Sequence, residues 1–343
     1  MPRVCIIGAG FAGLSAAQVL RDRGWEVVLV DKGRHPGGRA ATRSLGDRGQ
    51  CFDVGAQFWT ARDPTFAATV AAWADRGWCR IWSTGFPVLR PDGLHHENDG
   101  HPRWCAAGGM RALAATLAAG LDLRAHHSVV ALRPDDGGWA VDVVPGDAVR
   151  DAVDGPVTTL SVAAVIATQP LPQALDLCRS AGLPVADDLA QVAYDRCWYL
   201  LAEGPGARLL LSGSGGLRIE DPDLGATWLA SQRARGLRTT GEGFILHGDP
   251  ALSQACWDDP PEAVAGVLGG RLAAILGRLG LAWAPDRSEA RRWRYAKCRN
   301  PVARPCAAVA PGLVLAGDAF AAAPRVEGAW CSGRAAALAL IRD

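Results

Sequence analysis

The chain opens on the stretch VCIIGAGFAG, residues 4–13, in which an apolar run leads directly into a glycine-rich turn. A helical stretch follows, and then a second apolar run, VVLV at 27–30, which ends in Asp31. The pattern is G-x-G-x-x-G inside a strand–helix–strand unit, with an acidic residue 18 positions after the last glycine. The strand before the turn, the helix after it and the acid beyond all agree, so we predict a dinucleotide-binding unit.

Each residue of this pattern has a physical task. Gly8 permits the tight turn, Gly10 lets the backbone approach a pyrophosphate, and Gly13 lets helix and strand pack closely. The helix that begins here supplies unpaired N–H groups and the positive end of its dipole to the phosphates. Asp31 is placed to accept hydrogen bonds from a ribose diol.

Two further motifs select the dinucleotide. The string GGR at 37–39 resembles the second phosphate motif of the flavin amine oxidase superfamily; its glycines allow close backbone approach and its guanidinium can clamp a phosphate. Near the end, LVLAGD at 313–318 is a buried-strand pattern that resembles the flavin motif whose aspartate holds the ribityl chain. RVEGAWCSGRAA at 325–336 then reads as a helix start that would stabilise negative charge on a reduced flavin. Together the motifs predict FAD rather than NAD.

Composition favours an enzyme of the cytoplasm. A length of 343 residues predicts about two domains, and a net charge of +1 with 21% charged residues does not imply nucleic acid or a membrane surface as partner. The ten cysteines show no C-x-x-C spacing and no cluster with histidine, so we expect reduced thiols and no metal site. We expect no leader before the first predicted strand, and no uninterrupted apolar run of the sequence is long enough to span a membrane.

Hydrophobic periodicity gives a coarse map of elements. We predict strands at 3–7 and 26–30 around a helix at 11–23, a long helix at 260–279, a final helix at 329–341, and strands of a second sheet at 197–202, 209–212 and 243–247. The basic stretch 287–299 is interpreted as a solvated strand edge, with steering of an anionic dinucleotide as the alternative. The predicted fold class is α/β with an α+β substrate domain: a discontinuous Rossmann-type FAD-binding domain, 1–83, 103–170 and 288–343, and an inserted mixed-sheet substrate domain, 84–102 and 171–287.

Several longer strings carry a resemblance to a narrower family. The stretch FDVGAQFWTARD at 52–63 resembles a stretch found in bacterial renalase-like flavoproteins. The strings ILH at 245–247, RWRYA at 292–296 and RVEGA at 325–329 are also similar to that family. These segments are spread over nearly the whole chain. The sequence is therefore similar to renalase-like FAD-dependent oxidoreductases of the flavin amine oxidase superfamily.

The resemblance implies a fold like those of p-hydroxybenzoate hydroxylase and the amine oxidases, with noncovalent FAD. It implies hydride transfer from substrate to flavin N5, followed by reoxidation with O2 and release of H2O2. The implied substrates are small molecules, dihydro isomers of NAD(P)H, which would make a dinucleotide the substrate. Such an electron-rich ring gives up hydride readily, so no strong general base is expected.

Two alternatives stay open at this stage. The first is an FAD-dependent oxidase or dehydrogenase of a small amine or secondary metabolite. Many such relatives use a lysine near flavin N5, whereas the only lysines here are Lys32, beside the ribose acid, and Lys297, late in the chain. The second is a flavin-fold binding protein without catalysis, of the kind represented by Rab GDP-dissociation inhibitors.

The candidate catalytic residues are His247, Gln57 and Trp59. His247 ends an apolar strand, and strand alternation places it on one face with Ile245 while Leu246 faces the other side. The renalase-like pattern has a histidine at this place, which implies that the imidazole orients the substrate ring; the alternative is a histidine that only caps the turn. The residues assigned to FAD are Gly8, Gly10, Phe11, Ala12, Gly13, Asp31, Lys32, Gly38, Arg39, Gly55, Ala56, Gln57, Val129, Gly317, Asp318, Arg325, Val326 and Ala329.

Overall fold

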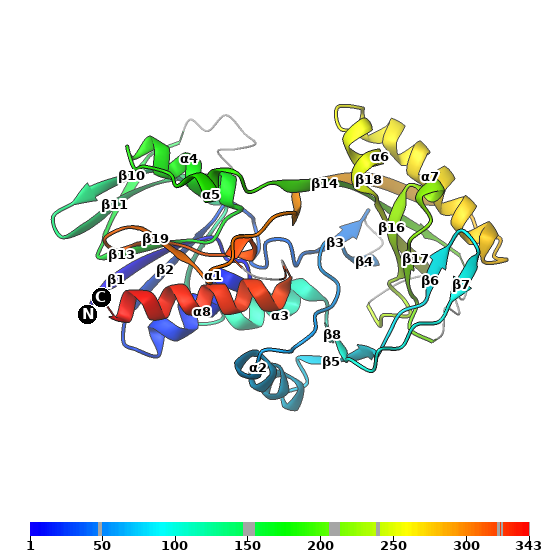
Figure 1. Ribbon diagram of the computed structural model, residues 1–343, viewed down its shortest axis with the longest axis horizontal. Coiled ribbons are helices and arrows are strands. Elements are labelled where there is room, and N and C mark those ends of the chain that lie inside the picture. Colours follow the sequence, from blue (N-terminus) through cyan, green and yellow to red (C-terminus); the bar gives the residue numbers. More distant parts are fainter. Residues whose placement is uncertain are drawn as a thin grey trace. The chain divides into compact units, whose positions relative to one another are not determined.

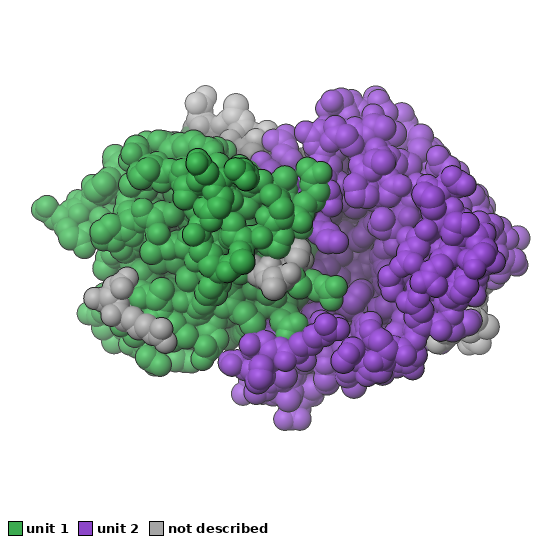
Figure 2. All heavy atoms as spheres, in the orientation of Figure 1, with its two compact units in different colours: residues 1–40, 114–193, 298–343 green, residues 41–113, 194–297 purple. Residues whose placement is uncertain are grey.

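A computed structural model describes residues 1–46, 50–146, 155–205, 213–237, 241–320, 323 and 325–342. Within it the chain forms two compact units, each assembled from separate segments (Figure 2). The first unit comprises 1–40, 114–193 and 298–343, and the second comprises 41–113 and 194–297. Each unit is described separately below.

The first unit is built on a six-stranded sheet in the order β19-β20-β13-β1-β2-β9 (Figure 1). The central strand β1 (Arg3–Ile7) pairs in parallel with β2 (Glu26–Asp31) on one side and β13 (Ala164–Ala167) on the other. Val4, Cys5 and Ile6 are fully buried, which explains why this strand is a continuous apolar run rather than an alternating one. The remaining strands are β9 (Asp122–Ala125), β19 (Ala307–Ala310) and β20 (Leu313–Leu315).

Helices α1 (Phe11–Arg21) and α8 (Val326–Arg342) pack against each other and against this sheet. A side chain at Gly333 of α8 would overlap the backbone of Ala12 in α1, so only glycine permits this close crossing. The unit also contains a three-stranded antiparallel sheet and two short helices. These elements are β10 (His127–Asp135), β11 (Gly138–Pro145), β12 (Thr158–Val162), α4 (Leu171–Ser180), α5 (Asp187–Ala190) and the 3-10 turn η2 (Asp318–Phe320).

The second unit is built on a seven-stranded sheet in the order β18-β14-β17-β16-β15-β6-β7. The pairs given by register are antiparallel except for β15 with β6, so the sheet is mixed. Its strands are β18 (Arg287–Cys298), β14 (Tyr194–Gly204), β17 (Glu242–Gly248), β16 (Ala226–Ser231), β15 (Gly216–Ile219), β6 (Val88–Arg90) and β7 (Gly93–His95). Two small two-stranded antiparallel sheets pair β3 (Thr42–Leu45) with β4 (Gln50–Asp53), and β5 (Cys79–Ser83) with β8 (Arg103–Ala106).

The two faces of this sheet pack into different clusters. Helix α7 (Pro261–Arg278) covers one face and buries Leu246 among its apolar side chains. Ile245 belongs to the other cluster, together with Tyr199, and the His247 ring meets the Tyr199 ring on that side. The predicted alternation along 245–247 is confirmed. The other helical elements of this unit are α2 (Pro64–Asp75), η1 (Pro222–Leu224) and α6 (Pro250–Ala255). The division between the units falls within α3 (Met110–Ala118), after Leu113.

The predicted elements agree with the structure to within a few residues where it describes them. The helix predicted at 11–23 ends at Arg21, and the last helix begins at Val326, three residues before the predicted start. The basic stretch 287–299 forms β18, which is an edge strand of its sheet. The strand predicted at 209–212 lies outside the described residues.

The boundaries of the two compact units differ from the boundaries of the predicted domains. Segments 41–83 and 103–113 pack with the second unit, although we placed them in the FAD-binding domain. A unit is defined by packing and an FAD domain by binding, so the predicted domains remain a prediction. None of the described helices combines the length and the apolar character that a membrane crossing requires.

Candidate functional site

The three glycines of the turn between β1 and α1 differ in whether the protein's own packing requires them. Gly8 has φ +104° and a Cβ there would lie 2.7 Å from Thr168 Oγ1, while a Cβ on Gly13 would overlap the carbonyl oxygen of Gly8. The protein's own packing therefore requires both. Gly10 has φ −76°, which any residue adopts, and a Cβ on it would meet nothing within 4 Å. A ligand approaching the backbone is the remaining physical reason for a glycine at this position.

The carboxylate of Asp31 ties the end of β2 to this turn. Its Oδ2 accepts a hydrogen bond from the Ala9 N–H and its Oδ1 accepts one from the Gly33 N–H, both at 2.6 Å. The GGR loop lies against the same turn, because Gly37 forms a parallel bridge with Gly10 and donates to the Ala9 carbonyl at 2.8 Å. Sequence-distant backbone segments thus meet around one open position.

Arg39 and Asp318 face each other across this part of the first unit. The guanidinium donates two hydrogen bonds to the carboxylate, from Nη1 to Oδ2 at 2.7 Å and from Nη2 to Oδ1 at 2.6 Å. Gly317, at φ +132°, donates its N–H to Ser332 Oγ of α8 at 2.9 Å. The GGR motif and the LVLAGD motif, whose Arg39 and Asp318 are 279 residues apart, therefore meet directly.

These residues share one edge of the six-stranded sheet. Strands β1, β2, β13 and β20 are parallel, so their carboxyl ends lie at the same edge, where open α/β sheets bind ligands. The turn after β1, Asp31 after β2 and Asp318 after β20 all belong to this edge. Arg325, Val326 and Ala329 form the start of α8, and Val129 lies on β10, which packs against β2.

The geometry of the first unit fits FAD. A glycine that only a ligand explains, a helix N-terminus without a side-chain cap and a carboxylate–guanidinium pair at the sheet edge supply contacts for pyrophosphate and hydroxyl groups. In the described residues, no three histidine, cysteine, aspartate or glutamate side chains gather as metal ligands would. All ten cysteines are free thiols.

In the second unit, the loop after β4 carries two of the predicted catalytic residues. Gln57 and Trp59 are both buried, at 3% and 1% exposure. Gln57 Nε2 and Trp59 Nε1 are buried nitrogens without a hydrogen-bond partner among the described residues. Trp59 packs edge-on against Trp73, and Gly55 and Ala56, between β4 and these side chains, are half-buried.

His247, the third predicted catalytic residue, also carries such an atom. Its Nε2 is buried and has no partner in the described part of the chain, whereas its ring hydrogen-bonds the Val54 carbonyl. A carbonyl only accepts, so the ring proton is assigned to Nδ1, and Nε2 presents a lone pair. Burial lowers the pKa of His247 to about 4, against a smaller rise from the Val54 carbonyl, so the imidazole is neutral at pH 7.

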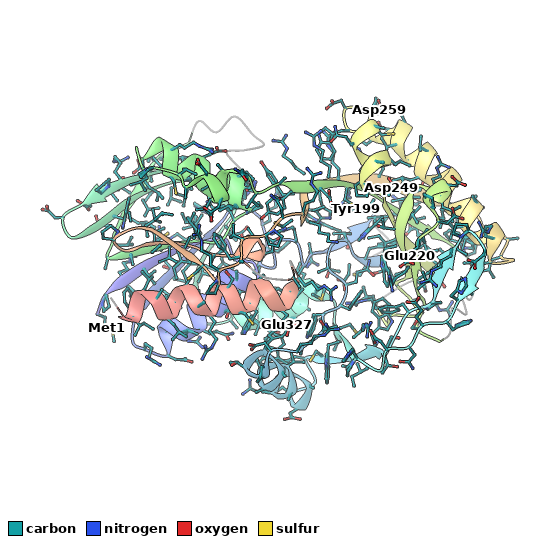
Figure 3. All side chains as sticks on the ribbon, viewed as in Figure 1. Met1, Tyr199, Glu220, Asp249, Asp259 and Glu327 are labelled. Carbon is teal, nitrogen blue, oxygen red and sulfur yellow. The ribbon has the colours of Figure 1, made fainter. Side chains whose placement is uncertain are left out.

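Two aromatic side chains complete this cluster. Trp293 of β18 donates from Nε1 to the same Val54 carbonyl at 3.0 Å, and its ring stacks on Tyr199 at 6.2 Å between centroids. Figure 3 marks Tyr199 on β14. The alternative that His247 caps the following turn gains no support, because Asp249 caps helix α6 by accepting from the Leu252 N–H.

The structure adds residues that sequence reasoning did not single out. Tyr199 was one of three tyrosines without a distinguishing pattern, and Arg235 stands among many arginines. Asp53 lies in the FDVGAQ string, two residues before Gly55, and this string is the one signal that pointed to its neighbourhood. The roles assigned to His247, Gln57, Trp59 and the FAD-contacting residues remain predictions.

Comparison with known proteins identifies the family. A model of the flavin containing amine oxidoreductases matches residues 91–341, and one of NAD(P)-binding Rossmann-like domains matches residues 6–73. The chain belongs to the flavin containing amine oxidoreductase family. Its membership confirms FAD as the cofactor and the predicted class, an FAD-dependent oxidoreductase with a Rossmann-like FAD-binding fold.

Curated relatives match over short stretches. The chain is 43% identical over 72 residues to a hydroxyneurosporene desaturase from Rubrivivax gelatinosus, which is 20% of this chain and 13% of the relative. It is 39% identical over 77 residues to a neurosporene-forming phytoene desaturase from Rhodobacter capsulatus, 22% of this chain and 14% of the relative. The matches thus span about a seventh of these relatives, so they do not transfer a substrate.

Solved structures share the fold along the whole chain. Putrescine oxidase bound to putrescine aligns with a TM-score of 0.71 at 14% identity, over 100% of this chain and 99% of that one. Cyclohexylamine oxidase from Brevibacterium oxydans IH-35A aligns with a TM-score of 0.70 at 15% identity, over 99% of both chains. At such identities the likeness shows the fold alone.

Proposed function

We propose that this oxidoreductase removes a hydride from an electron-rich dihydropyridine, an isomeric dihydro-NAD(P), and that O2 then accepts the electrons. The substrate loses one hydride and leaves as the aromatic pyridinium, NAD(P)+. FAD, when bound, would accept this hydride and pass its two electrons and its proton to O2, which would take one further proton from solvent and leave as H2O2. Aromatisation drives the first step, so the protein does not need to remove a separate proton.

The observation that carries the proposal is the unpartnered Nε2 of His247. With the proton on Nδ1, this atom accepts a hydrogen bond and so selects a donor. The amide N–H of a nicotinamide carboxamide is such a donor, and its orientation fixes the ring that carries the hydride. When no proton transfer is required, orientation is the main contribution that side chains can make to the rate.

The unpartnered N–H groups of Gln57 and Trp59 support the same reading. Both atoms are donors, so they complement carbonyl oxygens, whereas Nε2 of His247 complements an N–H. A carboxamide offers a carbonyl and an N–H on one group. The second unit therefore contains unpartnered polar atoms of both kinds, as recognition of a neutral amide would require.

The lysine content argues against the amine chemistry of many relatives. Lys32 belongs to the first unit, directly after Asp31, and Lys297 is an exposed residue of the edge strand β18. No other lysine exists in the sequence. A lysine-assisted oxidation of an amine would therefore require one of these two residues.

Amine oxidation is the second candidate, and one observation favours it. The stacked rings of Tyr199 and Trp293 are the type of aromatic surface that attracts a cation. Putrescine oxidase and cyclohexylamine oxidase, which share the fold, are named for amine substrates. The neutral His247 beside these rings suits the neutral dihydropyridine equally, so kinetics must decide.

Anaerobic stopped-flow mixing separates the two candidates. The FAD-loaded protein is mixed with isomeric dihydronicotinamide dinucleotides, with ordinary NADH and NADPH, and with putrescine and cyclohexylamine, while the flavin absorbance is followed. We expect the isomeric dinucleotides to bleach the flavin at least tenfold faster than either amine. Faster bleaching by an amine would replace the proposal with the second candidate.

A further inference from the structure

A fully buried ion pair lies beneath the loop that carries Gln57 and Trp59. Arg235 Nη2 lies 2.6 Å from Asp53 Oδ2, and both side chains are 0% exposed. The other carboxylate oxygen of Asp53 accepts from the Met110 N–H at 3.0 Å and from Thr42 Oγ1 at 2.5 Å. The Arg235 guanidinium also lies over the Trp82 ring, 5.4 Å from its centroid.

The same guanidinium binds the far end of the loop. Arg235 donates from Nε at 3.2 Å and from Nη2 at 2.7 Å to the carbonyl oxygen of Gln57. Asp53 ends β4, so one side chain joins the two ends of the short segment 53–57. The Asp53 N–H, meanwhile, donates to Gln232 Oε1 at 2.9 Å, which fixes the first end a second time.

The segment held in this way contains the carbonyl on which His247 depends. Val54 accepts from Trp293 Nε1 and from the His247 ring, so its position determines which ring nitrogen of His247 carries the proton. A loop free to rotate its peptide groups would release Nδ1 and allow the other tautomer. Arg235 therefore holds the loop, the loop holds the Val54 carbonyl, and this carbonyl keeps the proton of His247 on Nδ1 and leaves Nε2 as an acceptor.

Stability alone does not account for the pair. Taking two charges out of water costs about as much as their attraction returns, so an apolar pair of similar volume is often equally stable. The double donation to one carbonyl is geometry that the fork of an arginine provides and the single ammonium of a lysine does not. The arrangement favours a conformational role.

We propose that Arg235 is a positioning residue, which through Asp53 and the Gln57 carbonyl fixes the 53–57 loop and thereby the tautomer of His247. The catalytic consequence rests on the proposed function. The order of the 53–57 loop and the tautomer of His247 do not depend on the proposed function, and both can be measured without substrate.

The test compares Arg235→Lys with Arg233→Lys, an exposed arginine two residues earlier in the same segment. Lysine keeps the charge opposite Asp53 but loses the fork on Gln57. In the FAD-loaded protein we expect hydrogen exchange at 54–59 to accelerate at least tenfold in Arg235→Lys and to stay at the wild-type rate in Arg233→Lys. The nitrogen-15 shifts of His247 should move from a single Nδ1–H form toward a mixture of tautomers.

Kinetics with the fastest substrate supply the third readout. The reduction rate at saturation should fall about tenfold in Arg235→Lys while the half-saturating concentration changes less than threefold. Unchanged exchange at 54–59 together with an unchanged His247 tautomer would overturn the positioning role, whatever the activity. If no dihydropyridine reacts but exchange and tautomer respond, the positioning role stands and the proposed function fails.

The wild-type protein gives a check that does not depend on folding of the variant. Its His247 must show a protonated Nδ1 and an unprotonated Nε2 at pH 7, and its amides at 54–59 must be protected although they belong to a loop. A wild-type spectrum with the proton on Nε2, or unprotected amides at 54–59, would refute the inference by itself.

Discussion

Arg39 and Asp318, 279 residues apart in sequence, form a two-point ion pair at the sheet edge of the first unit. Each was assigned a separate contact with FAD, the guanidinium to a phosphate and the carboxylate to the ribityl chain. Their pairing shows that the two motifs lie together in the first unit, as the proposal of one cofactor site requires. It also shows that each group is pre-oriented by the other before any ligand contact is made.

The first prediction concerns Asp318. Asp318→Ala removes the charged acceptor and leaves Arg39 without this partner, so FAD should bind more weakly by about 1.5–3 kcal/mol. The measurement is the FAD dissociation constant of the apoprotein, from the quenching of flavin fluorescence. The control is Asp176→Ala, which changes a carboxylate of the same unit whose side chain is 73% exposed. This variant should bind FAD as the wild type does. Equal affinities for both variants would remove Asp318 from the cofactor site.

The second prediction separates the glycines of the turn. Gly10→Ala adds a methyl group that meets no protein atom within 4 Å, so the fold should keep its stability to within about 0.5 kcal/mol. The methyl group should obstruct the pyrophosphate and weaken FAD binding at least tenfold, about 1.4 kcal/mol. Gly13→Ala is the matched contrast, since its methyl group overlaps the Gly8 carbonyl and should lower the stability of the apoprotein.

Thermal unfolding of the two apoproteins and titration with FAD test this contrast. A Gly10→Ala protein that binds FAD normally would show that no ligand approaches this turn closely. Loss of stability in Gly10→Ala, in turn, would show that the protein itself requires the glycine.

The third prediction concerns His247. His247→Ala should retain FAD and the fold but slow flavin reduction about tenfold or more, which corresponds to some 1.4 kcal/mol, because the substrate loses its orienting acceptor. His247→Gln, whose amide oxygen also accepts hydrogen bonds, should recover part of the rate. Anaerobic stopped-flow reduction measures both variants. A wild-type rate in the alanine variant would make His247 a structural residue.

The fourth prediction concerns pH. Burial holds the pKa of His247 at about 4, below the ordinary value of 6.5, so between these pH values the unfolded chain binds a proton that the folded protein does not. Stability contributed by the neutral imidazole is therefore complete above pH 6.5 and decreases as the pH falls toward 4, by roughly 3 kcal/mol in all. Urea unfolding at several pH values should show a smaller decrease in His247→Gln. An equal decrease in both proteins would assign the pH dependence to other groups.

Local sequence patterns were sufficient to predict those features whose geometry is set by residues adjacent in the chain. The strand, the glycine turn and the helix at 3–21 form one contiguous unit, so adjacent residues alone set the geometry of the turn and of the helix N-terminus. The alternation that places Ile245 and His247 on one face follows from strand geometry alone. By contrast, no pattern indicated that Arg235 is buried, because arginine is usually exposed and its partner Asp53 is distant in sequence.

By itself, then, the sequence determined the cofactor and the class of fold, since both rest on short motifs whose geometry is set by adjacent residues. Tertiary structure decided which groups form hydrogen bonds and ion pairs with one another. Val54 meets His247 and Trp293, and Asp53 meets Arg235, only because strands from separate segments of the second unit are brought together. Hydrogen bonds and ion pairs act over a few ångströms, so they depend on distances in space that separation along the chain does not specify.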